Sequence, residues 1–329
     1  MIVRACFVSI LLLIGSFVFF INTPIQAIHE SFNITSGSSA NQVIEQLAQQ
    51  KIIRSKLYFK LLVTLQGYAD NLQTGEYAIN NNITPLQLLD NFVTGTIKQY
   101  KITIVEGSTF KQLLEHLYAN KDLEHKTKKL SAQQILIALN SSYRHPEGLF
   151  FPDTYFFHRG MSDLDLLQLS YDKMQRVLQT AWDVKTTSSL GLKQPYQALI
   201  LASIIEKETA SNTEVNKVSG VYHNRLNKIM HLNADPTVLY GVYGDFDQKL
   251  TKKDLARPGK YNTYINYGLP PTPIALPGLA AITAALNPLH TEMLYFVAKK
   301  NGEHHFSTNL RDHTNAINEI YKTVVQEKK

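Results

Sequence analysis

The residues with the clearest chemical potential lie between Leu199 and Ala210, a segment that reads LILASIIEKETA. At about 100° per residue, four aliphatic side chains share one face of the predicted helix, and Glu208 projects into the centre of that face. The four are Ile200, Leu201, Ile204 and Ile205. Glu206 faces the opposite way, and we expect it to point outward in a structural role, paired with a neighbouring basic residue. Because an apolar setting disfavours a charged carboxylate, we expect the pKa of Glu208 to rise, which suits a general acid. The alternative is a purely structural role, in which Glu208 sits at the end of the helix's buried face and forms an ion pair with a nearby Lys or Arg.

Polar residues recur beside aromatic or basic ones in the C-terminal half of the chain. Sugars present apolar ring faces and hydroxyl edges, so sugar sites combine aromatic rings with amides and carboxylates. The groups are Asn224 and Arg225; Asp235, Pro236, Thr237 and Tyr240; Tyr261, Asn262, Thr263 and Tyr264; Tyr295 and Phe296. Each group alone is more often core or loop capping, so the pattern favours a carbohydrate groove only when the groups are taken together.

Other catalytic chemistries find little support. His304, His305 and His313 are the best metal candidates, but adjacent histidines in a strand point to opposite faces, and neither HExxH nor CxxC spacing occurs. The chain also has no GxSxG, P-loop or GxGxxG motif. We therefore expect neither a metal nor a cofactor.

Composition favours a two-domain protein of the cell envelope. The chain has 329 residues, 44% of them hydrophobic, and a formal net charge of +6, enough for more than one core. The basic residues are scattered, which fits contact with anionic polymers and lipids better than recognition of nucleic acid. Cys6 is the single cysteine, so no intramolecular disulfide can form.

The amino terminus predicts a membrane anchor. The stretch from Ala5 to Ile21 is largely apolar, and no charged residue lies between Arg4 and Glu30, which is about the minimum for a membrane span. Arg4 favours a cytoplasmic N-terminus. A cleaved signal peptide is the alternative, but Ile25 and Ala27 do not form a small-x-small cleavage site.

Hydrophobic periodicity predicts a small α+β module after the anchor. Its expected elements are a strand at 32–34, helices at 40–50 and 56–65, a strand at 75–79 and a helix starting after Thr84 with Pro85 in its first turn. The order strand, helix, helix, strand over about 50 residues has the size of a glycan-binding LysM unit.

The remaining chain predicts a larger α+β domain. We expect a strand at 99–107, helices at 108–118 and 163–182, and ordered irregular structure at 145–157. The lysine-rich stretch 121–134 is a plausible boundary. Four prolines in Gly268–Gly278 exclude regular helix or central strand and suit a stiff groove wall or a rigid surface loop. The expected domains are an anchor at 1–28, a membrane-proximal LysM-like region at 29–140 and a catalytic domain at 141–329.

Six motifs follow one another in order along the chain. They are EGLFFPDTYFF at 147–157, ASIIEKETA at 202–210, DPTVLYG at 235–241, YNTY at 261–264, GLPPTPIALPG at 268–278, and YFVA followed by HHFSTN. Together they resemble the YceG-like endolytic murein transglycosylases. The resemblance extends from the anchor to near the end of the chain, with mild departures at Asn233, Ala234 and Thr272. In that family the second glutamate of the EKE triplet is catalytic, which implies Glu208.

The resemblance implies a lyase that cuts the MurNAc–GlcNAc bond within nascent peptidoglycan strands. The 6-hydroxyl of N-acetylmuramic acid would attack its own anomeric carbon and leave a 1,6-anhydro end. Glu208 would first donate a proton and then accept one. The predicted glycan-binding residues are Asn224, Asp235, Thr237, Tyr240, Asn262 and Tyr264. The resemblance also implies partnership with peptidoglycan synthases (penicillin-binding proteins), at the inner membrane with the catalytic domain outside the cytoplasm.

Two alternatives stay open at this point. A hydrolytic muramidase would need a second carboxyl group, for which Asp235 and Glu147 are the candidates. A membrane-tethered glycan-binding scaffold would need no acid at all, and an acid in an apolar setting argues against it.

Overall fold

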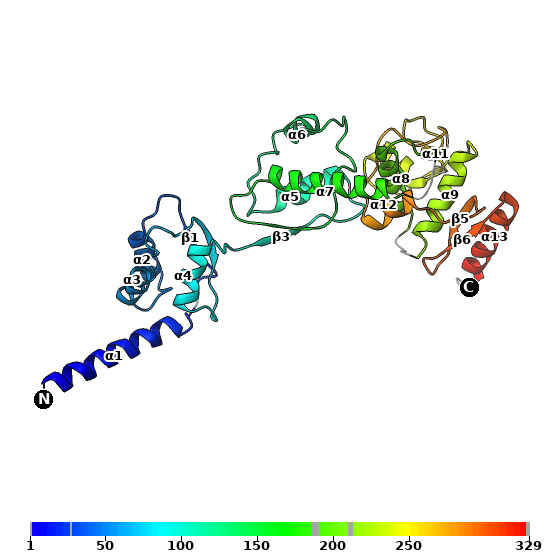
Figure 1. Cartoon of the computed structure of the whole chain (residues 1–329). Coiled ribbons are helices and arrows are strands. Elements are labelled where there is room, and N and C mark those ends of the chain that lie inside the picture. Colours follow the sequence, from blue (N-terminus) through cyan, green and yellow to red (C-terminus); the bar gives the residue numbers. More distant parts are fainter. Residues whose placement is uncertain (1, 27, 186–190, 210–212, 327–329) are drawn as a thin grey trace. The chain divides into compact units, whose positions relative to one another are not determined.

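The computed structural model describes the whole chain except residues 1, 27, 186–190, 210–212 and 327–329. The chain, drawn in Figure 1, divides into two compact units. Unit 1 comprises Met1–Lys101 and Phe156–Gly160, and unit 2 comprises Ile102–Tyr155 and Met161–Lys329. Both contain helices and short strands, so the expected α+β class is confirmed. The functional domain limits at residues 28 and 140 stay a prediction.

Unit 1 consists of the apolar helix α1 (Ile2–Asn22) and a small α+β module. The module contains β1 (Ser31–Ile34), α2 (Ala40–Gln49), α3 (Lys56–Leu65), β2 (Gly75–Ala78) and α4 (Pro85–Thr94). β1 and β2 pair antiparallel, with Phe32 opposite Tyr77. The predicted order strand, helix, helix, strand is thereby confirmed.

Hydroxyl residues define where the helices of unit 1 begin. Ser39 caps α2 and Thr84 caps α4, each completed by a glutamine three residues later, which satisfies backbone donors at the helix start. Pro85 occupies the first turn of α4, as predicted. The core below these helices is aromatic and aliphatic, and its largest members are Phe32, Phe59, Tyr77, Phe92, Ile44 and Leu47.

A buried carboxylate joins the two sequence segments of unit 1. Glu76 of β2 accepts hydrogen bonds from Ser31 Oγ at 2.5 Å and Tyr100 Oη at 2.9 Å, and Arg159 Nε lies 3.0 Å from it. Burial opposes the charge, but these partners hold the pKa of Glu76 below its usual value. Phe157 is buried and stacks on Tyr100 at 5.5 Å between ring centroids, so the segment 156–160 is held to the rest of unit 1 by this ring pair and by Arg159.

Unit 2 carries the remaining helices and the sheet of β5 and β6, while the strands β3 and β4 each contain residues of both units. β3 (Tyr100–Thr103) pairs with β4 (Thr154–Phe157), and β5 (Tyr295–Ala298) pairs antiparallel with β6 (His304–Ser307). The helices are α5 (Phe110–Ala119), α6 (Ala132–Ala138), α7 (Asp163–Asp183), α8 (Pro195–Glu208), α9 (Val215–Asn227), α10 (Asp235–Tyr243), α11 (Lys252–Leu255), α12 (Leu279–Leu286) and α13 (Leu310–Gln326).

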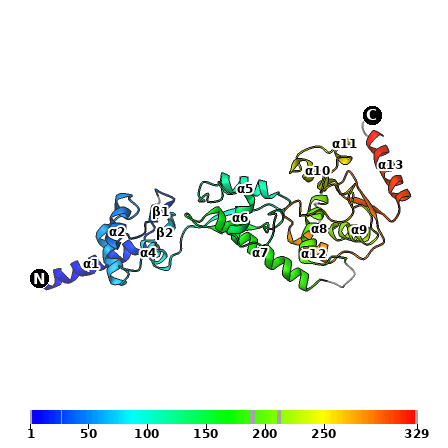
Figure 2. The ribbon, with the colours of Figure 1, turned by 90° about the horizontal axis from the view of Figure 1, so that it is seen from above.

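Helix α8 lies at the centre of unit 2. It packs against α12, α9, α7 and α10, and the first two lie beside it in both views (Figures 1 and 2). Every residue from Ala198 to Ile205 is buried, so α8 is apolar around its whole circumference and not on one face. The aliphatic arc predicted from the sequence is only a part of the buried surface.

The proline-rich segment Gly268–Gly278 forms no helix or strand, as predicted. Its second half is buried and packs in the interior of unit 2. Ile274, Ala275 and Leu276 have no exposed surface. Ser203 Oγ of α8 accepts a hydrogen bond from Ile274 N at 3.0 Å, and Leu276 exchanges backbone hydrogen bonds with Gly107 and Ser108. The segment therefore lies between α8 and the turn at Gly107 and Ser108, and it is hydrogen-bonded to both.

Gly148 tests how closely this segment is packed. A Cβ on Gly148 would lie 2.4 Å from Pro273 Cβ, whereas a Cβ on Gly268, which has the same φ of +79°, would meet nothing. Both Gly→Ala changes incur backbone strain of about 1 kcal/mol, but only Gly148→Ala also displaces the proline segment. We expect Gly148→Ala to lower the free energy of unfolding by about 1–3 kcal/mol more than Gly268→Ala, measured by chemical denaturation. Equal losses would mean that the segment can shift freely.

Candidate active site

The C-terminal end of α8 opens into a pocket of about 320 Å³ in unit 2. Side chains from α8, α9, α10, β5, β6 and the intervening loops line it: Glu208, Arg225, Leu232, Asn233, Asp235, Tyr264, Phe296, Val297, Ala298 and His304. Three of the residues predicted to form a site, Glu208, Asp235 and Tyr264, are brought together here.

Glu208 is the last residue of α8 and is half-buried. Its Oε1 accepts a hydrogen bond of 2.7 Å from the hydroxyl of Tyr222, which lies on α9 and is 1% exposed. The Tyr222 ring packs edge-on against Phe296 at 5.8 Å between centroids. The carboxyl group therefore has one fixed donor on one side and the pocket on the other.

The pKa of Glu208 is raised to about 7. Loss of hydration is the main cause, and the negative charge of Asp235 adds to it, while the Tyr222 hydrogen bond and the Arg225 charge act in the opposite direction. A carboxylic acid with this pKa carries its proton for much of the time near neutral pH, and it can also release that proton without a large cost. The expectation of a raised pKa is met. Among the residues that the structure describes, no lysine or arginine forms a direct ion pair with Glu208, so the structural alternative finds no support there.

Arg225 supplies fixed positive charge at the pocket. Its Nε donates to Leu294 O at 2.6 Å, and its Nη1 donates to Leu232 O at 2.8 Å and His231 O at 3.2 Å. Its guanidinium also lies over the Tyr295 ring at 5.1 Å. Backbone carbonyls orient this group without neutralising it, so its charge acts on whatever occupies the pocket.

Asp235 and Tyr264 line the same pocket. The Tyr264 hydroxyl donates to Asp235 Oδ1 at 2.5 Å. Asp235 is the first residue of α10, where the positive end of the helix dipole stabilises a carboxylate. The pair therefore presents an oriented negative charge near Glu208.

The other four predicted binding residues lie outside the pocket lining, and protein atoms engage their polar groups. The Asn224 amide donates to Thr291 O and Met293 O. The Asn262 amide donates to Leu255 O and Arg257 O, and Asn262 is 3% exposed. Thr237 donates to Ala234 O, and Tyr240 donates to Glu147. These contacts position the surrounding loops, and direct contact of the four with a substrate stays a prediction.

The expectation that Glu206 faces outward is wrong. Glu206 is half-buried, and its Oε2 accepts a hydrogen bond of 2.9 Å from the backbone N–H of Gly278. Burial raises the pKa of Glu206, and the nearby Glu106 charge contributes. Because α8 is enclosed on all sides, the face that carries Glu206 meets the proline-rich segment and not solvent. Glu206 nevertheless does not line the pocket.

Glu147 and His304 are polar side chains whose hydrogen-bond partners are protein groups. Glu147 is 3% exposed and accepts from Phe110 N at 2.8 Å and Tyr240 Oη at 3.0 Å, away from the pocket lining. His304 lines the pocket, and its Nδ1 lies 2.7 Å from Glu214. Within the described ranges no three His, Cys, Asp or Glu side chains are placed to hold a metal ion.

Tyr222 is the functional candidate that sequence reasoning missed. A signal existed, because Tyr222 and Arg225 are three residues apart and therefore neighbours on one helix face. Residues on several faces of Val215–Asn227 are buried, so its hydrophobic pattern does not predict a helix, and the relation is visible only in the structure. Arg225 and Phe296 belonged to groups singled out in the sequence, but their convergence on Glu208 depends on the tertiary fold.

Comparison with known proteins identifies the class. Residues 32–319 match the model of the YceG-like family, so the chain belongs to this family. The crystal structure of a yceG-like protein from Listeria monocytogenes superposes with a TM-score of 0.55 at 29% identity, covering 87% of this chain and 98% of the other.

Two relatives bear the same descriptive name. The endolytic murein transglycosylase of Bacillus subtilis (strain 168) is 32% identical over 307 residues, which are 87% of this chain and 83% of that protein. The endolytic murein transglycosylase of Streptococcus pneumoniae serotype 2 is 26% identical, and the match covers 87% of this chain but 57% of the longer pneumococcal protein.

Two substitutions should move the pKa of Glu208 in opposite directions. Tyr222→Phe removes a hydrogen bond that stabilises the carboxylate, so the pKa should rise above its value of about 7. Asp235→Asn removes a negative charge, so the pKa should fall. Carbon-detected NMR titration of labelled glutamate measures both shifts, with Glu208→Gln identifying the signal. Shifts of the same sign would contradict the electrostatic account.

Proposed function

We propose that this protein is an endolytic murein transglycosylase, a carbon–oxygen lyase that cuts the MurNAc–GlcNAc bond of peptidoglycan. One observation carries the proposal: the carboxyl group of Glu208 has a pKa raised to about 7 at the wall of a pocket in unit 2. The names of the relatives in Bacillus subtilis and Streptococcus pneumoniae support the same activity.

In the proposed reaction Glu208 acts first as acid and then as base. Its proton passes to the glycosidic oxygen as the bond from that oxygen to C1 of N-acetylmuramic acid breaks. The 6-hydroxyl of the same sugar bonds to C1, and its proton passes to the Glu208 carboxylate, which regenerates the acid. The nucleophile is tethered to its target, so proximity replaces the activation that a water molecule would need.

The neighbours of Glu208 suit this cycle. The hydroxyl of Tyr222 and the charge of Arg225 stabilise the carboxylate that exists between the two proton transfers. The charge of Asp235 opposes that carboxylate, and it would stabilise the positive charge that develops on the sugar ring in the transition state. The Phe296 ring at the pocket offers an apolar surface for a sugar face.

The two alternatives lack such support. Glu147 is hydrogen-bonded in the interior and does not line the pocket, which leaves Asp235 as the second carboxyl of a hydrolytic muramidase. The hydroxyl of Tyr264 already holds Asp235. A scaffold that only binds glycan gives no reason for a half-buried acid in the pocket.

Product analysis tests the proposal. Full-length protein in detergent, incubated with purified peptidoglycan, should release fragments ending in 1,6-anhydro-N-acetylmuramic acid, identified by mass spectrometry. Glu208→Gln should lower the rate by about 10²-fold or more, because it removes the proton that the leaving oxygen needs.

Glu206→Gln is the matched control on the same helix. Its amide oxygen can still accept from Gly278 N, so we expect activity close to that of the wild type. Reducing ends in place of anhydro ends would mean that water is the nucleophile. Full activity of Glu208→Gln would overturn the assignment of the acid.

The pH profile gives a second test. Glu208 must begin the cycle protonated, so kcat/KM should fall as the pH rises above about 7. Asp235→Asn lowers the pKa of Glu208, so the alkaline limb should move to lower pH whatever the change in maximal rate. An unmoved limb would show that another group sets it.

The finer organisation is part of the proposal. The strand, helix, helix, strand order of unit 1 and the pairing of β1 with β2 suit a LysM-like module. Helix α1 is long and apolar enough to cross a membrane, with a mean hydropathy of 2.4 over Arg4–Asn22. With Arg4 on the cytoplasmic side, the pocket of unit 2 would act outside the inner membrane, where synthases produce nascent strands.

A further inference from the structure

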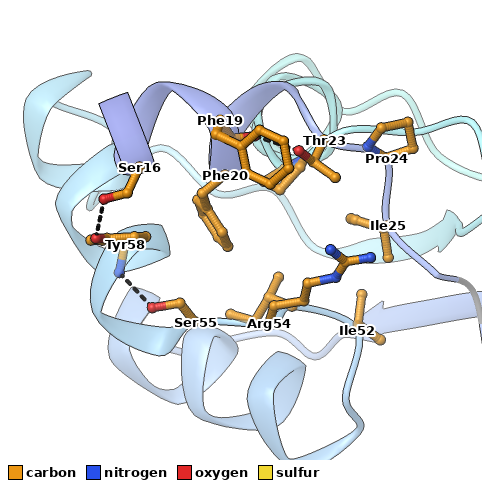
Figure 3. Close-up of a pocket in the computed structure, with 12 residues that line it drawn as sticks. Ser16, Phe19, Phe20, Thr23, Pro24, Ile25, Ile52, Arg54, Ser55 and Tyr58 are labelled. Atoms are coloured by element: carbon orange, nitrogen blue, oxygen red, sulfur yellow. Dashed lines mark hydrogen bonds between the residues drawn. The ribbon is translucent and has the colours of Figure 1, made fainter. Parts of the chain in front are cut away.

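A second pocket lies within unit 1, between the end of α1 and the start of α3 (Figure 3). Its volume is about 290 Å³, and Phe19, Phe20, Ile25 and Ile52 give it apolar walls. Arg54 is the charged residue among those that line it, and Figure 3 shows its guanidinium reaching toward Ile25. An apolar cavity with one cation at its edge matches an amphiphile with an anionic head.

Tyr58 fixes α3 against α1 beside this pocket. Its hydroxyl lies 2.6 Å from Ser16 Oγ, and its ring packs edge-on against Phe17 at 5.8 Å and Phe20 at 5.5 Å. Ser16 precedes the last residue of α1 by six positions, which is about 9 Å along the helix axis. Because Ser16 and Phe17 belong to the apolar stretch Arg4–Asn22, part of α3 lies beside the membrane-spanning segment and not beyond its end.

The outer face of α3 is apolar where an aqueous surface would be polar. Leu57, Leu61 and Leu65 are 72%, 41% and 67% exposed. Their spacing of four residues places them within an arc of about 80° on the helix. Tyr58 follows that arc directly at about 100°, so the leucines border the edge of α3 that meets α1.

Positive charge borders the other side of the leucine arc. Lys56 and Lys60 lie at about 260° and 300° on the same helical wheel, and both are exposed. Lys56 pairs with Glu45. Interfacial helices combine an apolar face buried about 5–10 Å into the headgroup boundary with lysines that reach the phosphates, which is the arrangement of α3 beside α1.

We propose that α3 is embedded in the membrane surface beside α1, and that the pocket holds an acyl chain of a phospholipid whose phosphate pairs with Arg54. The inference rests on membrane anchoring by α1 and is independent of the transglycosylase chemistry. It makes unit 1 a lipid-bound base for the enzyme and not a module that stands free of the bilayer.

Tryptophan fluorescence tests the depth of α3 in the full-length protein. Trp182 is the single tryptophan, so Trp182→Phe provides a dark background. Added to it, Leu61→Trp should give blue-shifted emission that acyl-brominated phosphatidylcholine quenches strongly in phosphatidylglycerol-containing vesicles. The matched control is Gln49→Trp, on the exposed end of α2, which should show emission typical of water and little quenching. Equal, weak quenching at both positions would overturn the embedding of α3.

Native mass spectrometry tests the occupant of the pocket. Full-length protein released from nanodiscs of phosphatidylcholine and phosphatidylglycerol should retain phosphatidylglycerol. Arg54→Gln should reduce that retention several-fold, whereas Lys51→Gln removes an equal charge from an exposed residue outside the pocket lining and should not. Equal losses would mean general electrostatic attraction, and no retention by the wild type would mean an empty pocket; either result would overturn the proposed lipid site. Peptidoglycan cleavage in detergent, measured alongside, reports separately on the proposed enzyme.

Discussion

The enclosure of α8 on all sides is the constraint on which the rest of unit 2 depends. Because Ala198–Ile205 are buried on every face, the last turn of α8 starts inside the protein, and Glu208 is half-buried at its end. Because α9, α12 and the proline-rich segment surround α8, Glu208 loses much of its hydration. The same enclosure supplies the side chains that limit this effect, since Tyr222 and Arg225 both come from α9. The raised pKa of Glu208 is thus a consequence of core packing.

Local signals in the sequence sufficed for the elements of unit 1 and for the expectation of a raised pKa at Glu208. Thr84, Pro85 and Gln87 identify the start of α4 in any context, and α3 was predicted with the bounds it has in the structure. The helices of unit 2 are harder to predict from the sequence. Helices such as α9 and α12 have weak amphipathic patterns because they are buried on several sides, so periodicity says little about them.

The outcome for Glu206 shows where reasoning from one helix stops. Wheel geometry separates Glu206 from Glu208 correctly, but it cannot tell solvent from a neighbouring segment 72 residues later in the chain. The same limit applies to Asn262. An amide close to two tyrosines suits a sugar site by composition. In the structure, however, the Asn262 amide N–H groups donate to the backbone carbonyls of Leu255 and Arg257. Residue type indicates which chemistry is available, and only tertiary contacts decide whether a side chain is free to use it.

The buried Glu76 has a consequence for how the chain can be divided. Its partner Arg159 and the stacked Phe157 belong to a short return of the chain, Phe156–Gly160, that lies far from β2 in sequence. Unit 1 is therefore discontinuous, and no single cut of the polypeptide separates the two units cleanly. A fragment ending at Lys101 would leave Glu76 without its arginine, and a fragment starting there would expose Phe157. A fragment that keeps both contacts must therefore extend at least from β2 to Arg159.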